Sequence, residues 1–474
     1  MTLVQQSASE LRRMILAHEV SPIEVLDAYI ARIQAIDPQI NAFTATCFDE
    51  ARVTAAALAD RIAKGEAPGL LAGLPVAIKD MTQTKGMRTT YGSPIYANFV
   101  PDRDDRVVGY IRAAGGVVFG KTNTTEFGAG NNTTNSVFGA TVNPFDRTKT
   151  SGGSSGGSAA ALATNMSPLC HGTDTGGSLR IPATFCGVVS LKPTPGLVPF
   201  ERRIFPLWPF MLQGAMGRTV DDMALLLRAM AVDDPIDPLS YPRDPEGFFP
   251  VEPIDLGGLR VAFSPDLGFA PTSAMIRRCF AEKTGRFRAE FRDHADAHPA
   301  IEGAVRVNWA LRGLQYLAQH EAHYRDHRDL LGPNVRMNYE QALELSLPDV
   351  AAAFREHGDL HREMERFFRE FDVLICPGAT VGPFAVEDLY VQEIDDVRMQ
   401  TYVEWAGLTN ALSTTGNPVV ALPCGRDANE MPYGLQIVGP RRSDALLLRI
   451  AKALESVFAD DPALARPIPA QWTS

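Results

Sequence analysis

Two glycine- and serine-rich segments near the middle of the chain interrupt otherwise apolar strand and helix patterns. They cover residues 151–158 (SGGSSGGS) and 172–178 (GTDTGGS). Because glycine lacks a Cβ, such segments can adopt strained dihedrals and bring several backbone N–H groups to one point. That arrangement forms an oxyanion hole, which stabilises the negative charge that develops on a carbonyl oxygen. The two segments together predict loops that support catalysis rather than flexible linkers.

Short apolar runs bounded by turn residues accompany these segments. Residues 74–78 and 117–120 each end at a lysine, and residues 371–377 and 418–423 repeat the apolar pattern near the end of the chain. Runs of this kind are typical of buried strands in an α/β sheet. We therefore expect an α/β protein that forms one large domain over residues 1–474.

Helices are predicted at both ends of the chain and in a long segment between the strands. Ser-x-x-Glu sequences at Ser7 and Ser21 are typical of capping boxes, and each opens an amphipathic stretch. Residues 275–369 are rich in Arg, Glu and His with helical periodicity, which indicates a helical surface layer. Residues 444–457 predict a final amphipathic helix before the chain ends.

Composition excludes several classes of function. The formal net charge of −11 has the wrong sign for a protein that binds nucleic acid over a broad surface. The six cysteines are scattered without a C-x-x-C pair, so reduced thiols are expected rather than disulfides or a zinc site. No signal peptide and no apolar run of about 18 residues is present, so we expect a cytoplasmic protein without a membrane partner.

Other catalytic motifs fit the two glycine-rich segments poorly. Neither segment is followed by lysine at the spacing of a phosphate-binding loop, and no G-x-G-x-x-G with an acidic partner occurs. The pattern around Ser154, G-x-S-x-G, matches the nucleophile elbow of α/β-hydrolases. That chemistry needs a histidine late in the chain, and no histidine follows His361.

The histidines of the helical region form pairs at helical spacing. His323 and His327 are four residues apart, as are His357 and His361, and each pair would share one helix face. The segment that begins at His320 (HEAH) differs from the zinc motif H-E-x-x-H, and arginines lie among these residues. We therefore predict solvated helix faces here and no metal site.

Without a histidine, a serine nucleophile requires another base, and a buried lysine can serve. Burial disfavours the charged form of lysine and lowers its pKa towards neutrality. Lys79, Lys121 and Lys192 each follow an apolar run, so each is a candidate. Sequence position alone does not rank the three.

Several motifs in order carry a family resemblance. Residues 73–80 (GLPVAIKD), 151–158 and 172–182 resemble the amidase signature family, and the match continues through residues 185–187, 191–194, 217–220 and 434–439. The resemblance implies one amidase domain with a central mixed β-sheet covered by helices and no cofactor. Within it, the signature core would span about 71–227, the helical layer about 275–369 and a C-terminal part about 371–460.

The resemblance also implies roles for individual residues. Lys79 would be the base, Ser154 the bridging serine reached through a cis peptide bond, and Ser178 the nucleophile. The oxyanion would be held by backbone N–H groups of the second glycine-rich segment, namely Thr175, Gly176, Gly177 and Ser178.

Further residues are implied in supporting and substrate-binding roles. Ser155 would support the Ser154 hydroxyl, and Asp174 and Arg180 would hold the shape of the nucleophile loop. The acyl pocket would be lined by the stretch that contains Phe127, Ala129 and Gly130. The apolar, aromatic residues 205–211 are expected to form either a hydrophobic wall for an aryl or alkyl group or part of the core.

The resemblance predicts an amidase that cleaves a C–N bond of a small-molecule amide or carbamate through a serine acyl-enzyme. The alternative is the glutaminase subunit of a tRNA-dependent amidotransferase, which resembles this chain too. Such subunits carry an acidic residue shortly before a Gly-x-Pro segment, whereas residues 405–408 here are WAGL and only Glu404 lies close. We expect a monomer or homodimer.

Overall fold

The computed structural model describes residues 2–472, in which eleven strands form one mixed β-sheet. The order across the sheet is β1 (Phe43–Thr46), β3 (Val117–Thr122), β2 (Pro75–Lys79), β4 (Leu169–Asp174), β6 (Leu212–Gly217), β5 (Val189–Lys192), β12 (Val419–Arg426), β13 (Pro432–Val438), β9 (Val373–Pro377), β7 (Arg260–Phe263) and β8 (Asp293–Asp296). β10 (Glu393–Ile394) and β11 (Val397–Arg398) form a separate hairpin. The predicted single α/β domain with a mixed sheet is confirmed.

The sheet is parallel near both edges and antiparallel in the middle. β3, β2 and β4 are parallel to one another, as are β9, β7 and β8, whereas the pairs from β4 to β9 across the centre are antiparallel. β2, β3, β9 and β12 are the four strands predicted from apolar runs. All residues of β2 and β3 are buried, because helices cover both faces of the sheet there.

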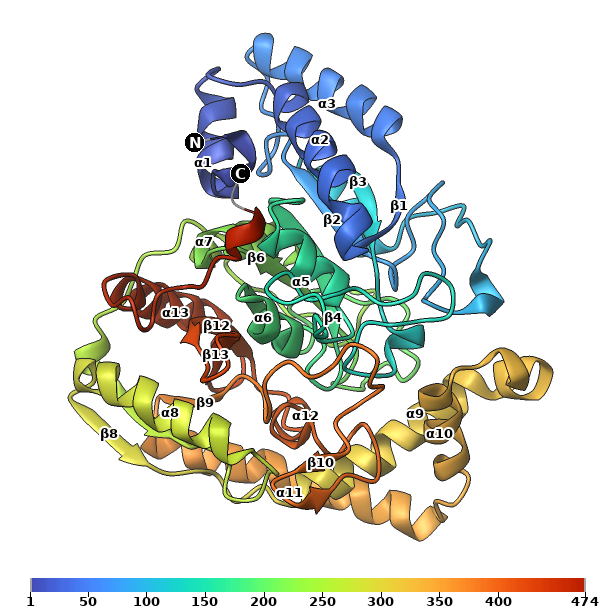
Figure 1. Cartoon of the computed structure of the whole chain (residues 1–474), viewed down its shortest axis with the longest axis vertical. Helices are drawn as coiled ribbons and strands as arrows, with labels where there is room; N and C mark the ends of the chain where they lie inside the picture. Colours follow the sequence, from blue (N-terminus) through green and yellow to red (C-terminus); the bar gives the residue numbers. More distant parts are fainter. Residues whose placement is uncertain (1, 473–474) are drawn as a thin grey trace.

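Thirteen α-helices of the described residues cover this sheet (Figure 1). They are α1 (Ala8–Leu16), α2 (Pro22–Ile40), α3 (Phe48–Ala63), α4 (Arg106–Ala113), α5 (Gly156–Ala163), α6 (Arg180–Cys186), α7 (Val220–Met230), α8 (Ala274–Phe287), α9 (Ala304–His327), α10 (Pro333–Ala342), α11 (Leu347–Glu370), α12 (Gly407–Thr414) and α13 (Asp444–Ala459). No helix within residues 2–472 has both the length and the apolar character needed to cross a lipid bilayer.

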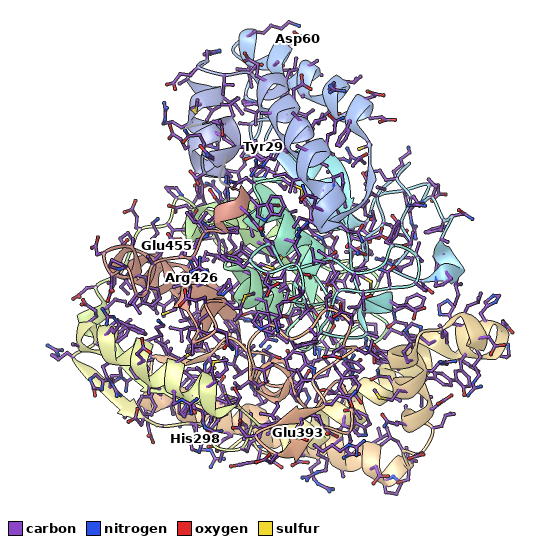
Figure 2. All side chains as sticks on the ribbon, viewed as in Figure 1. Tyr29, Asp60, His298, Glu393, Arg426 and Glu455 are labelled. Carbon is purple, nitrogen blue, oxygen red and sulfur yellow. The ribbon has the colours of Figure 1, made fainter. Side chains whose placement is uncertain are left out.

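Local signals start the first two helices at the predicted positions. The Ser7 hydroxyl accepts the N–H of Glu10 at the start of α1, and Ser21 and Glu24 form a complete capping box at the start of α2. Tyr29 of α2 is fully buried, whereas Asp60 of α3 lies at the outer rim (Figure 2). Helices α1–α3 therefore form a cover at one end of the molecule.

The predicted helical layer over residues 275–369 differs from the structure in two respects. It contains the edge strand β8, whose short sequence Asp-His-Ala-Asp has all four residues exposed. α9 is also no surface helix throughout, since about half of its length is buried beneath α10, α11 and α12. In Figure 1, α9 and α10 extend along one side of the molecule, with α11 beside them.

The order of strands determines where the two glycine-rich segments meet. β2 and β4 are parallel neighbours, with Val76 opposite Leu169 and Ala77 opposite Cys170. Their carboxyl ends therefore lie at the same edge of the sheet. The segment after β4 and the segment before α5 both reach this edge.

Candidate active site

Lys79 is the last residue of β2 and lies at the centre of a cluster of hydroxyl groups. Its Nζ is 2.7 Å from Ser154 Oγ, 2.9 Å from Ser155 Oγ and 2.8 Å from Thr173 Oγ1. The side chain is fully buried, and this burial lowers the pKa of Lys79 to about 7 against an opposing effect of Asp174. Lys79 is thus able to exchange a proton near neutral pH.

The first glycine-rich segment brings Ser154 to this lysine. The peptide bond between Gly153 and Ser154 is cis, and α5 begins two residues later. Gly152 has a φ of +77°, and a Cβ there would lie 2.9 Å from the backbone of Pro182. Only glycine fits this close approach without displacing α6.

The second segment carries Ser178 to the same place. It leaves the end of β4, turns at Gly177 with a φ of +122°, and leads into α6. A Cβ at Gly177 would meet the Thr409 hydroxyl at 2.4 Å. Within the described residues the Ser178 hydroxyl makes no hydrogen bond, and Ser178 and Ser154 both line one cavity. Ser178 therefore has a hydroxyl available to a bound molecule.

The other two candidate lysines are held elsewhere. Lys121 of β3 donates to the Thr82 carbonyl and to Thr89 Oγ1 and lies 3.6 Å from Asp80 Oδ1. Lys192 of β5 donates to the Asn417 carbonyl at 2.6 Å. Burial lowers the pKa of Lys121 to about 8 and that of Lys192 to about 7, so pKa alone would not have separated the three. Contact with the glycine-rich segments distinguishes Lys79.

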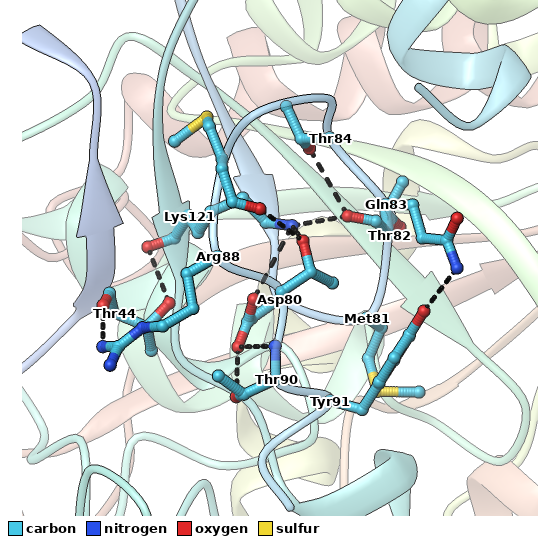
Figure 3. Close-up of polar contacts among 12 residues, drawn as sticks. Thr44, Asp80, Met81, Thr82, Gln83, Thr84, Arg88, Thr90, Tyr91 and Lys121 are labelled. Atoms are coloured by element: carbon cyan, nitrogen blue, oxygen red, sulfur yellow. Dashed lines mark hydrogen bonds and ion pairs between the residues drawn. The ribbon is translucent and has the colours of Figure 1, made fainter. Parts of the chain in front are cut away.

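Lys121 has a supporting part, which Figure 3 shows. Its contacts with Asp80 and with the Thr82 carbonyl anchor the loop that follows Lys79. On the other side of this loop, Gln83 Nε2 donates to the Tyr91 hydroxyl at 2.8 Å, and both side chains line the cavity. The buried contact between Lys121 and Asp80 thereby holds in place the loop that forms one wall of the cavity.

Asp174 and Arg180 form a fully buried ion pair at the base of the loop that carries Ser178. Arg180 Nη2 lies 3.0 Å from Asp174 Oδ1, and the same carboxylate accepts the N–H groups of Gly177 and Leu179. Burial alone would raise the pKa of Asp174, but Arg180 and these hydrogen bonds hold it below the ordinary value. The pair thus fixes the backbone on both sides of Ser178.

These contacts bear on the expected oxyanion donors. The N–H of Gly177 already donates to Asp174 Oδ1 at 2.8 Å, so it is committed to the loop. In the described chain, the N–H groups of Thr175, Gly176 and Ser178 donate to no other group. Three of the four expected donors therefore remain available.

A cavity of about 430 Å³ opens over Ser178 and Ser154. Its wall combines apolar and aromatic side chains with polar ones. The lining includes Met81, Tyr91, Tyr96, Phe99, Phe127, Phe200, Met211 and Leu212, together with Gln83, Arg202, Gln213, Arg312, Gln315, Tyr316, Gln319 and His323. Such a wall suits a small organic molecule with an apolar group.

The residues expected to bind substrate fall into different places. Phe127 lines the main cavity, and Gly130 lines a small cleft beside Ser178. Ala129 lines neither, and its carbonyl accepts a hydrogen bond from Asn334 Nδ2 at 3.1 Å. The stretch therefore contributes Phe127 and Gly128 to the main cavity and Gly128 and Gly130 to the small cleft.

Of the two expectations for residues 205–211, the structure favours the core over the cavity wall. Met211 lines the cavity, but Trp208 and Phe210 are buried in the core against α11, and Leu207 is 74% exposed. Arg203 holds the segment in this position, because its guanidinium donates to the carbonyls of Trp208 and Phe210 and pairs with Asp237. The segment folds around that arginine rather than along the cavity.

The prediction of a solvated helix face is correct for His327, which is exposed, but wrong for His323 of the same pair and for His320. His320 is buried, and His323 is half-buried, lines the cavity and stacks on Phe127 at 5.2 Å between ring centroids. Burial lowers the pKa of His320 to about 3. His357 is also half-buried and bonds to the Thr414 carbonyl. These side chains are covered because α9 and α11 pack against other elements on these faces.

In the described chain, Ser178 has neither a histidine partner nor a group of metal-ligating side chains beside it. No hydrogen bond there joins a histidine to Ser154, Ser155 or Ser178. Nor do the described residues contain a group of three or more His, Cys, Asp or Glu side chains able to hold a metal ion. All six cysteines are free, and five of them are buried.

Two residues near Ser178 were not singled out from the sequence. Thr173 is a third hydroxyl on Lys79, and it lies inside the second glycine-rich segment. Arg312 of α9 lines both the cavity and the small cleft beside Ser178. The position of Thr173 before Asp174 was a signal available in the sequence, whereas nothing in the helical pattern marked Arg312.

Comparisons with known proteins agree with this architecture. A family model described as Amidase matches residues 24–448. A glutamyl-tRNA(Gln) amidotransferase subunit from Alkaliphilus metalliredigens is 32% identical over 98% of this chain and 99% of its own. An acylamidase from Rhodococcus erythropolis is 33% identical over 95% of each chain. A solved bacterial aryl acylamidase of the amidase signature enzymes superimposes with a TM-score of 0.90 at 25% identity, covering 98% of this chain and 97% of that one.

The mixed sheet and the family model over residues 24–448 together define the class of this protein. It is a hydrolase of amide C–N bonds other than peptide bonds. Within that class, the chain belongs to the amidase signature family.

Proposed function

We propose that this protein hydrolyses a small-molecule amide or carbamate with an aryl or alkyl group through an acyl-enzyme on Ser178. The observation that carries the proposal is the buried Lys79, whose Nζ contacts Ser154 Oγ at 2.7 Å beside a cavity that Ser178 also lines. A lysine with a pKa of about 7 is substantially neutral at physiological pH, which a base must be.

In the proposed reaction, neutral Lys79 accepts a proton from Ser154, which accepts one from Ser178. The Ser178 alkoxide attacks the carbonyl carbon, and the oxyanion meets the free N–H groups of Thr175, Gly176 and Ser178. The proton returns through Ser154 to the leaving nitrogen, and the C–N bond breaks. Water then attacks the acyl-enzyme with the same groups as base and acid, which releases the acid and restores Ser178.

The character of the cavity supports an apolar substituent on the substrate. Tyr91 and Phe127 stack with their rings 6.2 Å apart, and Tyr96 meets Phe127 edge-on. Aromatic walls of this kind favour planar, apolar groups. A bacterial aryl acylamidase is among the similar solved structures, and its name describes an aryl group on the substrate.

The alternative, a glutaminase subunit of a tRNA-dependent amidotransferase, has relatives of that name in its favour. Glutamine carries an ammonium group that an acidic side chain would hold. Among the described residues that line the cavity, none is Asp or Glu. Glu404 lies outside this lining, and its carboxylate accepts the N–H of Gln400 at 2.6 Å. The cavity therefore favours the small-molecule amidase.

Covalent labelling tests the nucleophile directly. The wild-type protein and Ser178→Ala are treated with an aryl phosphonofluoridate, and the adduct is located by peptide mass. We expect one adduct on Ser178 that is absent from the variant, and hydrolysis of p-nitroacetanilide that falls by about 10⁴-fold or more in Ser178→Ala. An adduct on Ser154 or Ser155, or none at all, contradicts the assignment.

A further inference from the structure

Arg312 is a buried cation on the wall of the cavity. It is only 8% exposed, and its Nε donates to Asn338 Oδ1 at 2.9 Å. Its Nη2 donates to the hydroxyls of Tyr316 and Tyr402, whose rings also flank the guanidinium. All of these partners are neutral, and no described carboxylate forms an ion pair with Arg312. The guanidinium is therefore fixed in place but not neutralised.

The other buried arginines of the described chain have an acid partner or donate hydrogen bonds from both terminal nitrogens. Arg180 contacts Asp174, and Arg203 contacts Asp237. Arg218 has no acid partner, but both of its terminal nitrogens donate to carbonyl oxygens. Burial of an unpaired charge is costly, and flanking aromatic rings offset only part of that cost. A guanidinium on a cavity wall that has N–H groups without a partner is typical of a binding site in which the ligand supplies the negative charge.

The position of Arg312 places it in the substrate site. It lines the main cavity together with Ser178 and Thr175, and it also lines the small cleft formed by Ser178, Gly176 and neighbouring residues. Its Nη1 donates to no described residue. The two N–H groups of Arg312 Nη1 are thus free on the cavity wall that also carries Ser178.

The other charged side chains that line the cavity indicate which charge the ligand does not carry. Arg202 is the second arginine of the lining, and its Nη2 is paired with Asp105 at 2.6 Å. Burial lowers the pKa of His323, the one described histidine of the lining. No described acidic side chain lines the cavity. A ligand anion is therefore stabilised by Arg312, whereas a ligand ammonium has no counter-charge.

We propose that the substrate is an amide that also carries a carboxylate and no ammonium group, as in a monoamide of a dicarboxylic acid, and that Arg312 binds this carboxylate. This inference rests on the proposed amidase function and specifies its substrate class. The planar guanidinium forms charge-assisted hydrogen bonds to the carboxylate, which orients the scissile carbonyl towards Ser178. Arg312 thus acts in specificity and binding, while the chemistry remains with Lys79, Ser154 and Ser178.

Ligand binding tests the proposal without requiring turnover. The Ser178→Ala protein is titrated calorimetrically with the monoamides of succinate, glutarate and adipate, which cover a range of chain lengths. Each is matched with the neutral amide that has a methyl group in place of the carboxylate. Glutamine completes the set, because it is the glutarate monoamide with an added ammonium. We expect at least one monoamide to bind about 10- to 100-fold more tightly than its neutral partner and, at that length, than glutamine.

Variants of two arginines on the same helix assign the effect. In the Ser178→Ala background, Arg312→Gln is expected to abolish the preference for the carboxylate, and Arg312→Lys to restore part of it. Arg325→Gln removes an exposed arginine of α9 and is expected to retain the full preference. Thermal unfolding of each variant confirms that it is folded.

The outcomes separate this proposal from the proposed function. Equal binding of carboxylate and neutral amides, or a preference that survives Arg312→Gln, overturns the assignment of Arg312. Tighter binding of glutamine than of the glutarate monoamide overturns the exclusion of ammonium. Ammonia release from the monoamides by the wild-type protein is measured in parallel. Arginine-dependent binding without any hydrolysis would retain the carboxylate site and refute the amidase function.

Discussion

Lys79 combines complete burial with three hydroxyl partners and no carboxylate contact. Hydroxyl groups accept a hydrogen bond from either protonation state of the amine, so they leave burial as the main influence on its pKa. A carboxylate in the same place would favour the charged form and remove the base at neutral pH. The hydroxyl groups of Ser154, Ser155 and Thr173 around the amine therefore support the proposed proton transfer.

The pKa of about 7 for Lys79 predicts an acidic limb in the pH profile of the proposed hydrolysis. Only the neutral amine accepts a proton, so kcat/KM should rise with pH, fall tenfold per pH unit well below 7, and level off above 8. Steady-state kinetics from pH 5 to 9 measure the limb. His323→Gln is the control for the titratable group at the cavity, and it should leave the midpoint unchanged. A flat profile between pH 6 and 8 contradicts the assignment of Lys79.

Thr173→Val is expected to impair the same lysine. The variant removes the Oγ1 that accepts from Nζ at 2.8 Å, so kcat/KM should fall by about 10-fold. The protonated amine loses an acceptor, so the midpoint of the pH limb should move to lower pH. Thr124→Val is the matched control, because the Thr124 hydroxyl is buried and has no hydrogen-bond partner in the described chain. Equal losses in both variants would reduce the role of Thr173 to packing.

Part of this residue-level arrangement could be predicted from the sequence. The motifs identified Lys79, Ser154 and Ser178 as a set, but position alone left Lys79, Lys121 and Lys192 equivalent. The choice depends on the pairing of β2 with β4, which no local pattern specifies. Arg312 was missed because a charged residue in a helix rich in charge is indistinguishable from a surface residue until the packing of α9 is known.

At the scale of elements, the loop between β4 and α6 depends on one buried ion pair. Asp174→Ala should lower the free energy of unfolding by about 3–5 kcal/mol, because it leaves Arg180 buried without its counter-charge and two N–H groups without an acceptor. Chemical denaturation measures the change.

An exposed pair provides the comparison for this loss. Asp27 and Arg52 lie 2.7 Å apart on the surface of α2 and α3, and Asp27→Ala should cost less than about 1 kcal/mol. Similar losses in the two variants would show that the loop does not depend on the Asp174 pair.

The elements themselves were more predictable than their packing. Apolar runs gave β2, β3, β9 and β12, because a strand covered on both faces has a continuous apolar sequence. β8 has no such run and joins the sheet only at its edge. The segment 205–211 is apolar enough for a cavity wall, yet the hydrogen bonds of Arg203 direct it into the core.

At the scale of the whole molecule, a single chain supplies Ser178, Ser154 and the residues that line the cavity around them. The lining of the cavity comes from the loops after β2, β3, β4 and β5, from the segment before α5, from β6 and from α9. We therefore expect the purified chain to hydrolyse aryl amides without a partner, as a monomer or homodimer. Size-exclusion chromatography with light scattering, combined with p-nitroacetanilide assays of the same fractions, measures both properties. Activity that appears only with a second, different protein would support the amidotransferase alternative.

Because the cavity wall joins segments from residue 81 to residue 323, it exists only when distant parts of the chain are folded together. Any molecule that fills it binds the native state alone, and so shifts the unfolding equilibrium of the entire domain. At a concentration 100 times its Kd, such a ligand adds about 2.7 kcal/mol to stability. Melting curves of the Ser178→Ala protein against a library of amides can therefore rank substrates before any reaction is assayed.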